Sequence, residues 1–208
     1  GRYEAGIEGS IDDISKARTS HTDIEIGTSP KAISQKDAIP YNYVYCSEAQ
    51  ALAKEMTPNS NYTSSLMFGI QWDLVCKFLE VNGKVAIADI SSDSSTWGNY
   101  NNVTRRISSD NAKQGSNWIA ITGTKPTSNI LLTTGASEET NKMNIYDLAG
   151  NEWEWILEHA TSSSISPCAC RGGSCSYSGS SYPVSYRSHG GTTNVGNSIG
   201  FRSTFFEK

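Results

Sequence analysis

The sequence has no apolar run long enough to cross a bilayer, and only one pair of adjacent basic residues, Arg105 and Arg106. A membrane-spanning helix takes about 20 consecutive apolar residues, so membrane insertion is not expected. Binding of nucleic acid is not expected either, because neutralising phosphates requires clustered Lys and Arg. The formal net charge of -4 agrees with that exclusion.

The signatures of common hydrolases are also missing. The sequence contains neither the G-x-S-x-G turn of α/β-hydrolases nor the H-E-x-x-H helix of metalloproteases. The three histidines stand in largely polar surroundings, and the adjacent Glu138 and Glu139 are expected in a solvated turn. No residue set for hydrolysis is therefore predicted.

The five cysteines do not form the pattern of a disulfide scaffold. Their odd number leaves at least one thiol unpaired within the chain. Cys168, Cys170 and Cys175 could form a metal site, but their spacing lacks the C-x2-C hairpin of structural zinc. The fourth ligand would have to be the distant His159 or His189. Incidental thiols or one local disulfide are the alternatives.

The residues that the chain does contain in quantity are Gly, Ser, Asn and Thr, together with ten Tyr and five Trp. This composition favours a folded, loop-rich chain, because the aromatic residues supply a core. The length of 208 residues suits one domain over residues 1–208. Since the chain begins with Gly, we expect a fragment or processed form truncated at its N-terminus.

Hydrophobic spacing predicts two helices. The first is predicted at 47–56, with Ser47 as its N-cap and Pro58 beyond its end. The second is predicted at 70–79, where apolar residues recur at helical spacing and should be buried: Trp72, Val75, Cys76 and Leu79. Strands are predicted at 1–7, 24–26, 85–90 and 130–134, with a last strand from Phe201 onward. Residues 91–117 are predicted to be a long loop that Trp97 and Tyr100 attach to the core.

Residues 144–155, NIYDLAGNEWEW, hold the densest pattern in the chain. Charged and aromatic residues alternate from Glu152 to Trp155. An extended strand would therefore place both indoles on one face, in the core, and both carboxylates on the other. Carboxylate and main-chain oxygens are also the ligands that calcium prefers. A structural calcium ion could be held by Asp147, Gly150, Glu152 and Glu154, and no cofactor is expected to be required.

This stretch resembles the D-x-x-G-N-x-W-E-W signature shared by formylglycine-generating enzymes and a branch of C-type-lectin-like proteins. Further matching pieces follow in order: RGGS at 171–174, YR at 186–187 and IGFR at 199–202. Upstream matches are Pro40, Val44 and Ala49, then QWD at 71–73, and GRYEA at 1–5. The resemblance implies an α+β, C-type-lectin-like fold of the formylglycine-generating-enzyme subtype, with two helices, short twisted strands and much loop.

The resemblance does not extend to the catalytic cysteines. Enzymes of this family carry R-G-G-S-x-x-C and a second Cys five residues later, and these positions are Tyr177 and Tyr182 here. Cys175 lies two residues early and has no partner at the required spacing. Copper-thiolate oxidation then lacks its ligand pair, so the chain is not expected to be an enzyme. A divergent thiol oxidase acting through Cys175 is the competing hypothesis.

Residues 175–197 are rich in Tyr, Ser, Gly, Thr and Asn, a composition typical of adaptable recognition surfaces. We predict that this segment binds a ligand, with Tyr177, Tyr182 and His189 as anchors. The remaining contacts are predicted at Cys175, Ser178, Ser181, Ser188, Thr192, Asn194 and Asn197. Tyr186 and Arg187 match fixed positions of the family and are assigned structural roles. An ordinary loop of small residues is the alternative.

In the resembling lectin-like branch, variable proteins of diversity-generating retroelements carry their variable segment between R-G-G and I-G-F-R. Residues 175–197 occupy that place. The resemblance implies a receptor-binding or adhesion protein of a phage tail or bacterial surface, whose partner is a protein or glycan on a cell. Homo-oligomerisation is left open. A structural tip protein without a specific ligand is a further alternative.

Overall fold

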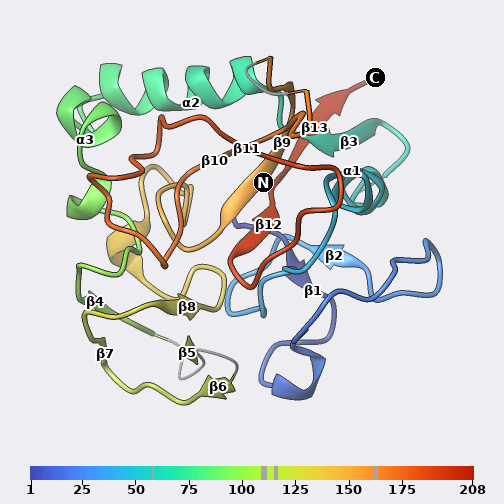
Figure 1. Ribbon diagram of the computed structural model, residues 1–208, viewed down its shortest axis with the longest axis horizontal. Helices are drawn as coiled ribbons and strands as arrows, with labels where there is room; N and C mark the ends of the chain where they lie inside the picture. The colour runs from blue at the N-terminus through green and yellow to red at the C-terminus, as the bar shows by residue number, and fades with distance from the viewer. Residues whose placement is uncertain (58, 109–111, 115–116, 162–163) are drawn as a thin grey trace.

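The computed structural model describes residues 1–57, 59–108, 112–114, 117–161 and 164–208 (Figure 1). Its α-helices are α1 (Cys46–Glu55), α2 (Gly69–Val81) and α3 (Ile87–Ser91), and its 3-10 turns are η1 (Ile14–Lys16), η2 (Ser94–Thr96) and η3 (Glu138–Thr140). Its strands are β1 (Gly6–Ile7), β2 (Ala32–Ile33), β3 (Tyr62–Leu66), β4 (Arg105–Arg106), β5 (Ala112–Gln114), β6 (Asn117–Ile119), β7 (Thr124–Lys125), β8 (Ile130–Leu132), β9 (Trp153–His159), β10 (Cys168–Arg171), β11 (Ser188–Gly190), β12 (Ile199–Phe201) and β13 (Ser203–Glu207).

The largest sheet has the order β11-β10-β9-β12 and is built around β9 (Figure 1). Strand β9 pairs antiparallel with β10 and parallel with β12, where Trp153 lies opposite Ile199. The chain then continues into β13, which pairs antiparallel with β3. The segment between β10 and β12 therefore starts on one side of β9 and ends on the other.

The predicted alternation in residues 152–155 is present in β9. Trp153 and Trp155 pack in one core cluster with Phe201, and the Trp155 indole N–H donates to the carbonyl oxygen of Val44 at 3.0 Å. The Glu154 carboxylate instead accepts from Arg202. Because side chains alternate along a strand, the indoles and the carboxylates belong to opposite faces of β9.

Both predicted helices form, with shifted ends. Helix α1 begins before the predicted N-cap Ser47, because the Glu48 carboxylate accepts the backbone N–H of Tyr45 at 2.8 Å and caps the helix there. Helix α2 begins at Gly69 and ends at Val81; Trp72, Cys76 and Leu79 are buried as predicted, whereas Val75 is only partly buried.

The strand predicted at 85–90 is wrong, because helix α3 begins at Ile87 within this run. Only Val85 and Ile90 are buried, whereas Ile87 is 58% exposed, so the burial does not alternate as in a strand. Short apolar runs are ambiguous between the two structures. The strand predicted at 24–26 is absent from these described residues, and the strand at 1–7 is reduced to β1.

The loop predicted at 91–117 is partly regular, because η2, β4 and β5 lie within it; residues 109–111 and 115–116 of this prediction lie outside the described residues. Trp97 and Tyr100 are buried in the second core cluster beside Trp72 and Ile156, as predicted. Among the described residues, no helix is both long and apolar enough to span a membrane.

Candidate functional site

The candidate site is the segment 175–197, which we call the contact segment. Two glycines directly before it determine the backbone conformation at its start. Gly172 and Gly173 have φ values of 95° and 76°, which favour glycine. A Cβ atom at Gly173 would lie 2.5 Å from the Tyr182 carbonyl oxygen. The buried Tyr100 hydroxyl lies 3.0 Å and 3.1 Å from the carbonyl oxygens of Gly172 and Tyr182. This packing therefore joins the start of the segment to its middle.

The backbone of the contact segment is bonded mainly to residues outside it. The Asn101 side chain donates to the Ser176 carbonyl oxygen at 3.0 Å, and the Trp72 indole N–H donates to that of Val184 at 3.0 Å. Near the other end, the Asn42 side chain donates to the Asn197 carbonyl oxygen at 2.8 Å. The path of the segment is thus determined largely by the surrounding protein, which leaves many of its side chains free for contact.

Four aromatic rings gather where the segment crosses β9. The Tyr182 ring packs edge-on against Trp153, Tyr177 and Tyr186, with centroid distances of 5.3, 4.6 and 4.9 Å. Edge-to-face geometry is favourable for aromatic pairs. Tyr177 and Tyr186 are each 43% exposed. The cluster therefore presents two rigid, amphipathic rings to solvent, which is what a recognition surface needs.

A pocket of about 330 Å³ lies beside this cluster, between β9, β11 and the end of the segment. Its walls are formed by Trp153, Trp155, Cys170, Ser176, Tyr177, Ser188, His189, Gly190, Asn194, Gly196, Asn197, Ser198 and Ile199. Among these described residues, none is Lys, Arg, Asp or Glu. Aromatic surface with a few hydroxyl, amide and imidazole groups is typical of sites that bind uncharged ligand groups.

Most predicted contact residues are accessible. Tyr177, Ser181, His189, Thr192, Asn194 and Asn197 are exposed, and Ser178, Tyr182 and Ser188 are half-buried. Cys175 is the exception, because only 3% of it is exposed and its backbone N–H is bonded to the Asn151 carbonyl oxygen. We therefore correct its prediction as a contact residue. Cys175 is buried, and its backbone bond helps to hold the start of the segment in place. Burial, with a smaller contribution from Glu152, raises the pKa of the Cys175 thiol to about 12.

Tyr186 and Arg187 take different roles. Arg187 forms ion pairs with Asp73 of α2 and with Glu158 of β9, and Asp73 also pairs with the buried Arg171. Arg187 therefore connects the segment to α2 and β9, which agrees with the structural role predicted for it. Tyr186 packs against Tyr182 in the aromatic cluster and is partly exposed, so we add it to the candidate contact residues.

The four residues proposed for calcium occupy a buried layer. The Asp147 carboxylate accepts from the Gly135 N–H at 2.6 Å and from the Thr140 hydroxyl at 2.8 Å, and Glu154 pairs with Arg202 at 2.8 Å. Gly150 forms part of a turn in which its N–H donates to the Gly172 carbonyl oxygen. Within the described chain, the three carboxylates do not converge as a ligand group. A calcium ion here remains a prediction, which requires the melting temperature to fall on chelation.

Glu152 is the unusual member of this layer. Neither of its buried carboxylate oxygens has a hydrogen-bond partner among the described residues. Burial, followed by repulsion from Glu154, raises the pKa of Glu152 well above its usual value. Burial, together with Asp147 and Glu152, likewise raises the pKa of Glu4. These two carboxyl groups therefore keep their protons to a higher pH than an exposed glutamate does.

The cysteines considered as possible metal ligands do not form a ligand group with a histidine among the described residues. All five cysteines lie within the described ranges, and none forms a disulfide. Among the described residues, the one group of three side chains that could hold an ion is His21, Asp23 and Glu48. In that group Glu48 already accepts from the His21 ring and from two backbone N–H groups.

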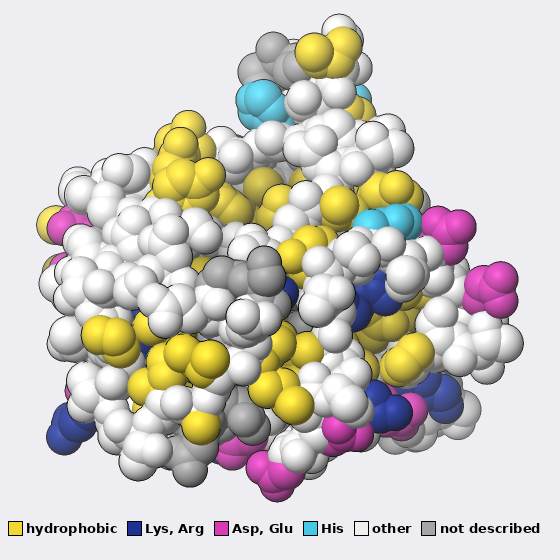
Figure 2. Space-filling view, turned by 60° about the horizontal axis from the view of Figure 1, so that its bottom comes forward, with side chains coloured by type: hydrophobic (Ala, Val, Ile, Leu, Met, Phe, Trp, Pro, Cys, Tyr) yellow, Lys and Arg dark blue, Asp and Glu magenta, His cyan; other side chains and the backbone are white. Residues whose placement is uncertain are grey.

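Charge is dispersed on the face of the molecule that Figure 2 shows. Figure 2 shows a face on which uncharged polar and hydrophobic side chains predominate, with acidic and basic groups mostly toward its margins. No extended area of one sign is visible on this face among the residues that the figure colours. The view offers no basic surface suited to a phosphate backbone.

These features define an α+β protein of the C-type-lectin-like type whose loop surface flanks an uncharged pocket. Residues 8–204 match the family model described as Sulfatase-modifying factor enzyme 1-like domain, and the chain belongs to that family. Among curated proteins, none matches the sequence.

Two solved structures are similar to the chain. The crystal structure of CarF has a TM-score of 0.53 at 13% identity, with 83% of this chain and 73% of that chain covered. Treponema denticola variable protein 1 has a TM-score of 0.49 at 14% identity, with 92% of this chain and 78% of that chain covered. At such identities the likeness to CarF shows a shared fold alone.

Proposed function

We propose that the chain is a non-enzymatic binding protein that contacts its ligand through the contact segment and the pocket beside it. The proposal rests on one observation. The backbone of the segment is bonded to the surrounding protein, whereas many of its side chains are exposed. Outside residues such as Asn101 and Asn42 hold the path of the segment, while Tyr177, His189 and Asn194 face solvent. A preorganised surface costs less to order on binding.

The ligand that this surface fits best is an uncharged group on a cell-surface protein or glycan. No described residue that lines the pocket carries a carboxylate, ammonium or guanidinium group. Exposed Tyr, Asn, Ser and His side chains provide ring faces and hydrogen bonds that suit such a group. A phage tail or a bacterial surface is the location that we propose for the protein.

We also propose that retroelement-directed mutagenesis diversifies the contact segment. The segment lies between the RGG at 171–173 and the IGFR at 199–202, and its exposed side chains can change without loss of the bonds that hold its backbone. The neighbouring genetic locus tests this. A reverse transcriptase gene with a near-copy of the coding region would support the proposal, and its absence from the complete locus would contradict it.

Binding is tested on arrays of glycans and cell-surface proteins, and then with variants. The double variant Tyr177→Ala with His189→Ala should weaken binding at least about tenfold, as loss of anchor residues does. Tyr62→Ala is the matched control, because Tyr62 is 37% exposed and lies in β3, outside the segment. Undiminished binding by the double variant would overturn the proposal. Failure to find any ligand would favour the structural tip protein.

The competing function is a divergent thiol oxidase. The positions of its thiol pair are Tyr177 and Tyr182, and burial raises the pKa of the Cys175 thiol to about 12, which disfavours the reactive thiolate at neutral pH. We therefore expect no conversion of a cysteine-containing peptide in the presence of copper. Conversion that is lost in Cys175→Ser would favour the oxidase.

A further inference from the structure

Helix α2 carries a second apolar stripe on its outer face. Ile70, Leu74, Phe78 and Val81 are 67%, 60%, 45% and 66% exposed. Their spacing of four, four and three residues places them on one side of a helix. Phe68 before the helix and Ile87 beyond it are also exposed apolar residues, at 42% and 58%.

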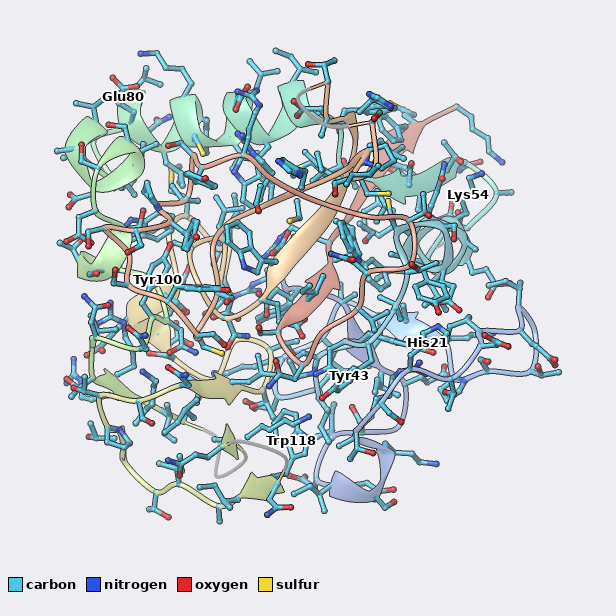
Figure 3. All side chains as sticks on the ribbon, in the orientation of Figure 1. His21, Tyr43, Lys54, Glu80, Tyr100 and Trp118 are labelled. Carbon is cyan, nitrogen blue, oxygen red and sulfur yellow. The ribbon has the colours of Figure 1, made fainter. Side chains whose placement is uncertain are left out.

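The fold itself does not account for this stripe. The helix docks on the core through its other face, where Trp72, Cys76 and Leu79 are buried. A surface helix typically presents polar residues opposite its buried face. In Figure 1, α2 lies along the upper edge of the molecule with no other described element beyond it, and Figure 3 places Glu80 at the same outer edge.

The exposed area is large enough to matter. From these exposed fractions, the stripe with Phe68 and Ile87 presents at most on the order of 600 Å² of surface, the upper end of the range for the largest apolar patch on a typical monomer. If two copies covered these surfaces with each other, they would bury on the order of 1,200 Å², which is the lower limit for specific interfaces.

We propose that α2 packs against α2 of a second copy in an antiparallel, two-fold symmetric dimer. A two-fold interface uses the same surface on both chains, and rows of side chains four residues apart interdigitate readily between helices. The antiparallel arrangement also places opposite ends of the two helix dipoles side by side.

The charges beside the stripe favour a copy of this chain over an anionic membrane. Lys77 and Glu80 form an ion pair at 2.9 Å on the exposed side of the helix, so both signs are present there. Helices that lie on membranes instead carry an excess of Lys and Arg on their polar face.

The dimer is tested on the whole chain by sedimentation equilibrium over a series of concentrations from about 1 to 200 µM, a range that reaches the affinities of weak specific interfaces. The wild type should show a concentration-dependent monomer–dimer equilibrium. The variant Leu74→Glu with Val81→Glu should raise the dimer dissociation constant at least about tenfold, because it buries like charges across the two-fold axis. Since both side chains are exposed, its circular dichroism and melting temperature should match the wild type.

Ile26→Glu is the matched control, because Ile26 is 47% exposed and lies away from α2, and it should dimerise as the wild type does. A wild type that stays monomeric at every concentration would overturn the proposal. So would a double glutamate variant that still dimerises, or a monomer that binds vesicles of anionic lipid through the stripe. None of these residues belongs to the contact segment, so this test is independent of ligand binding.

Discussion

The two faces of β9 use polar groups in opposite ways. On one face, Trp153 lies beneath the exposed tyrosines and an open, uncharged pocket. On the other face, Glu154 and Arg202 form an ion pair from which water is excluded, with each side chain 1% exposed. We therefore expect stability to depend mainly on the second face and the proposed ligand binding on the first. Changes to the two faces should therefore have separable effects.

The largest loss of stability is expected from Arg202→Met. Arg202 donates to both oxygens of Glu154 and to the Tyr146 carbonyl oxygen, so its removal leaves a buried carboxylate unpaired, at a cost of about 3–5 kcal/mol. Arg106→Met is the control, because the exposed Arg106–Glu139 pair should contribute less than about 1 kcal/mol. Urea unfolding measures both, and equal losses would contradict the division between the faces.

A smaller loss is expected from Gly173→Ala, just before the contact segment. Both Gly173 and Gly83 have positive φ, at 76° and 64°, and alanine at either should cost on the order of 1–3 kcal/mol. A Cβ atom would meet the Tyr182 carbonyl oxygen at Gly173 but open space at Gly83. Gly173→Ala should therefore be clearly more destabilising than Gly83→Ala in urea unfolding. Equal effects would show that the segment adjusts freely.

The buried face should also have a distinctive pH dependence. Because the pKa of Glu152 is raised in the folded protein, the unfolded chain loses this proton first as the pH rises above about 4.5. The contribution of Glu152 to stability therefore decreases with rising pH, until the pH exceeds the folded-state pKa, by at most about 1.4 kcal/mol per pH unit.

Glu152→Gln should remove this contribution. The variant should unfold at a higher urea concentration than the wild type at pH 8, and the difference should shrink toward pH 5. A stabilisation that grows as the pH falls would contradict the raised pKa of Glu152.

The smallest effect is expected on the pocket face. Thr192→Ala and Asn194→Ala change exposed side chains of the contact segment, and each should alter stability by no more than about 0.5 kcal/mol. Thermal unfolding checks this. A loss comparable to that of Gly173→Ala would mean that these side chains hold the segment in place, and the comparison between the faces would fail.

Much of the fold was accessible from the sequence because its strongest patterns are periodic. The alternation at 152–155 and the helical spacing in α1 and α2 each involve several residues that must be buried together. Residues 85–90 offered only a short apolar run, which suits a strand or a helix equally. Weak local preference was overridden there by the packing of Val85 and Ile90 into the second core cluster.

The candidate site was only partly predictable, for a different reason. Composition indicated that residues 175–197 form a surface. Composition cannot show, however, which side chains of a loop face the core and which face solvent. Cys175 is buried and Tyr186 is half-exposed because the backbone bonds of the segment orient them. The outer stripe of α2 could have been read from the spacing of Ile70, Leu74, Phe78 and Val81, which shares the helical period of the inner face.

A loop whose shape is imposed by its neighbours is a natural platform for a combinatorial library. Randomised codons at positions such as Ser181, His189 and Thr192 should yield mostly folded products, since none of these side chains is fully enclosed. Each variant would share the same backbone conformation of the segment. Selection could therefore act on the affinity for a ligand and not on the ability to fold. The scaffold would then tolerate rapid turnover of specificity with little cost to its yield.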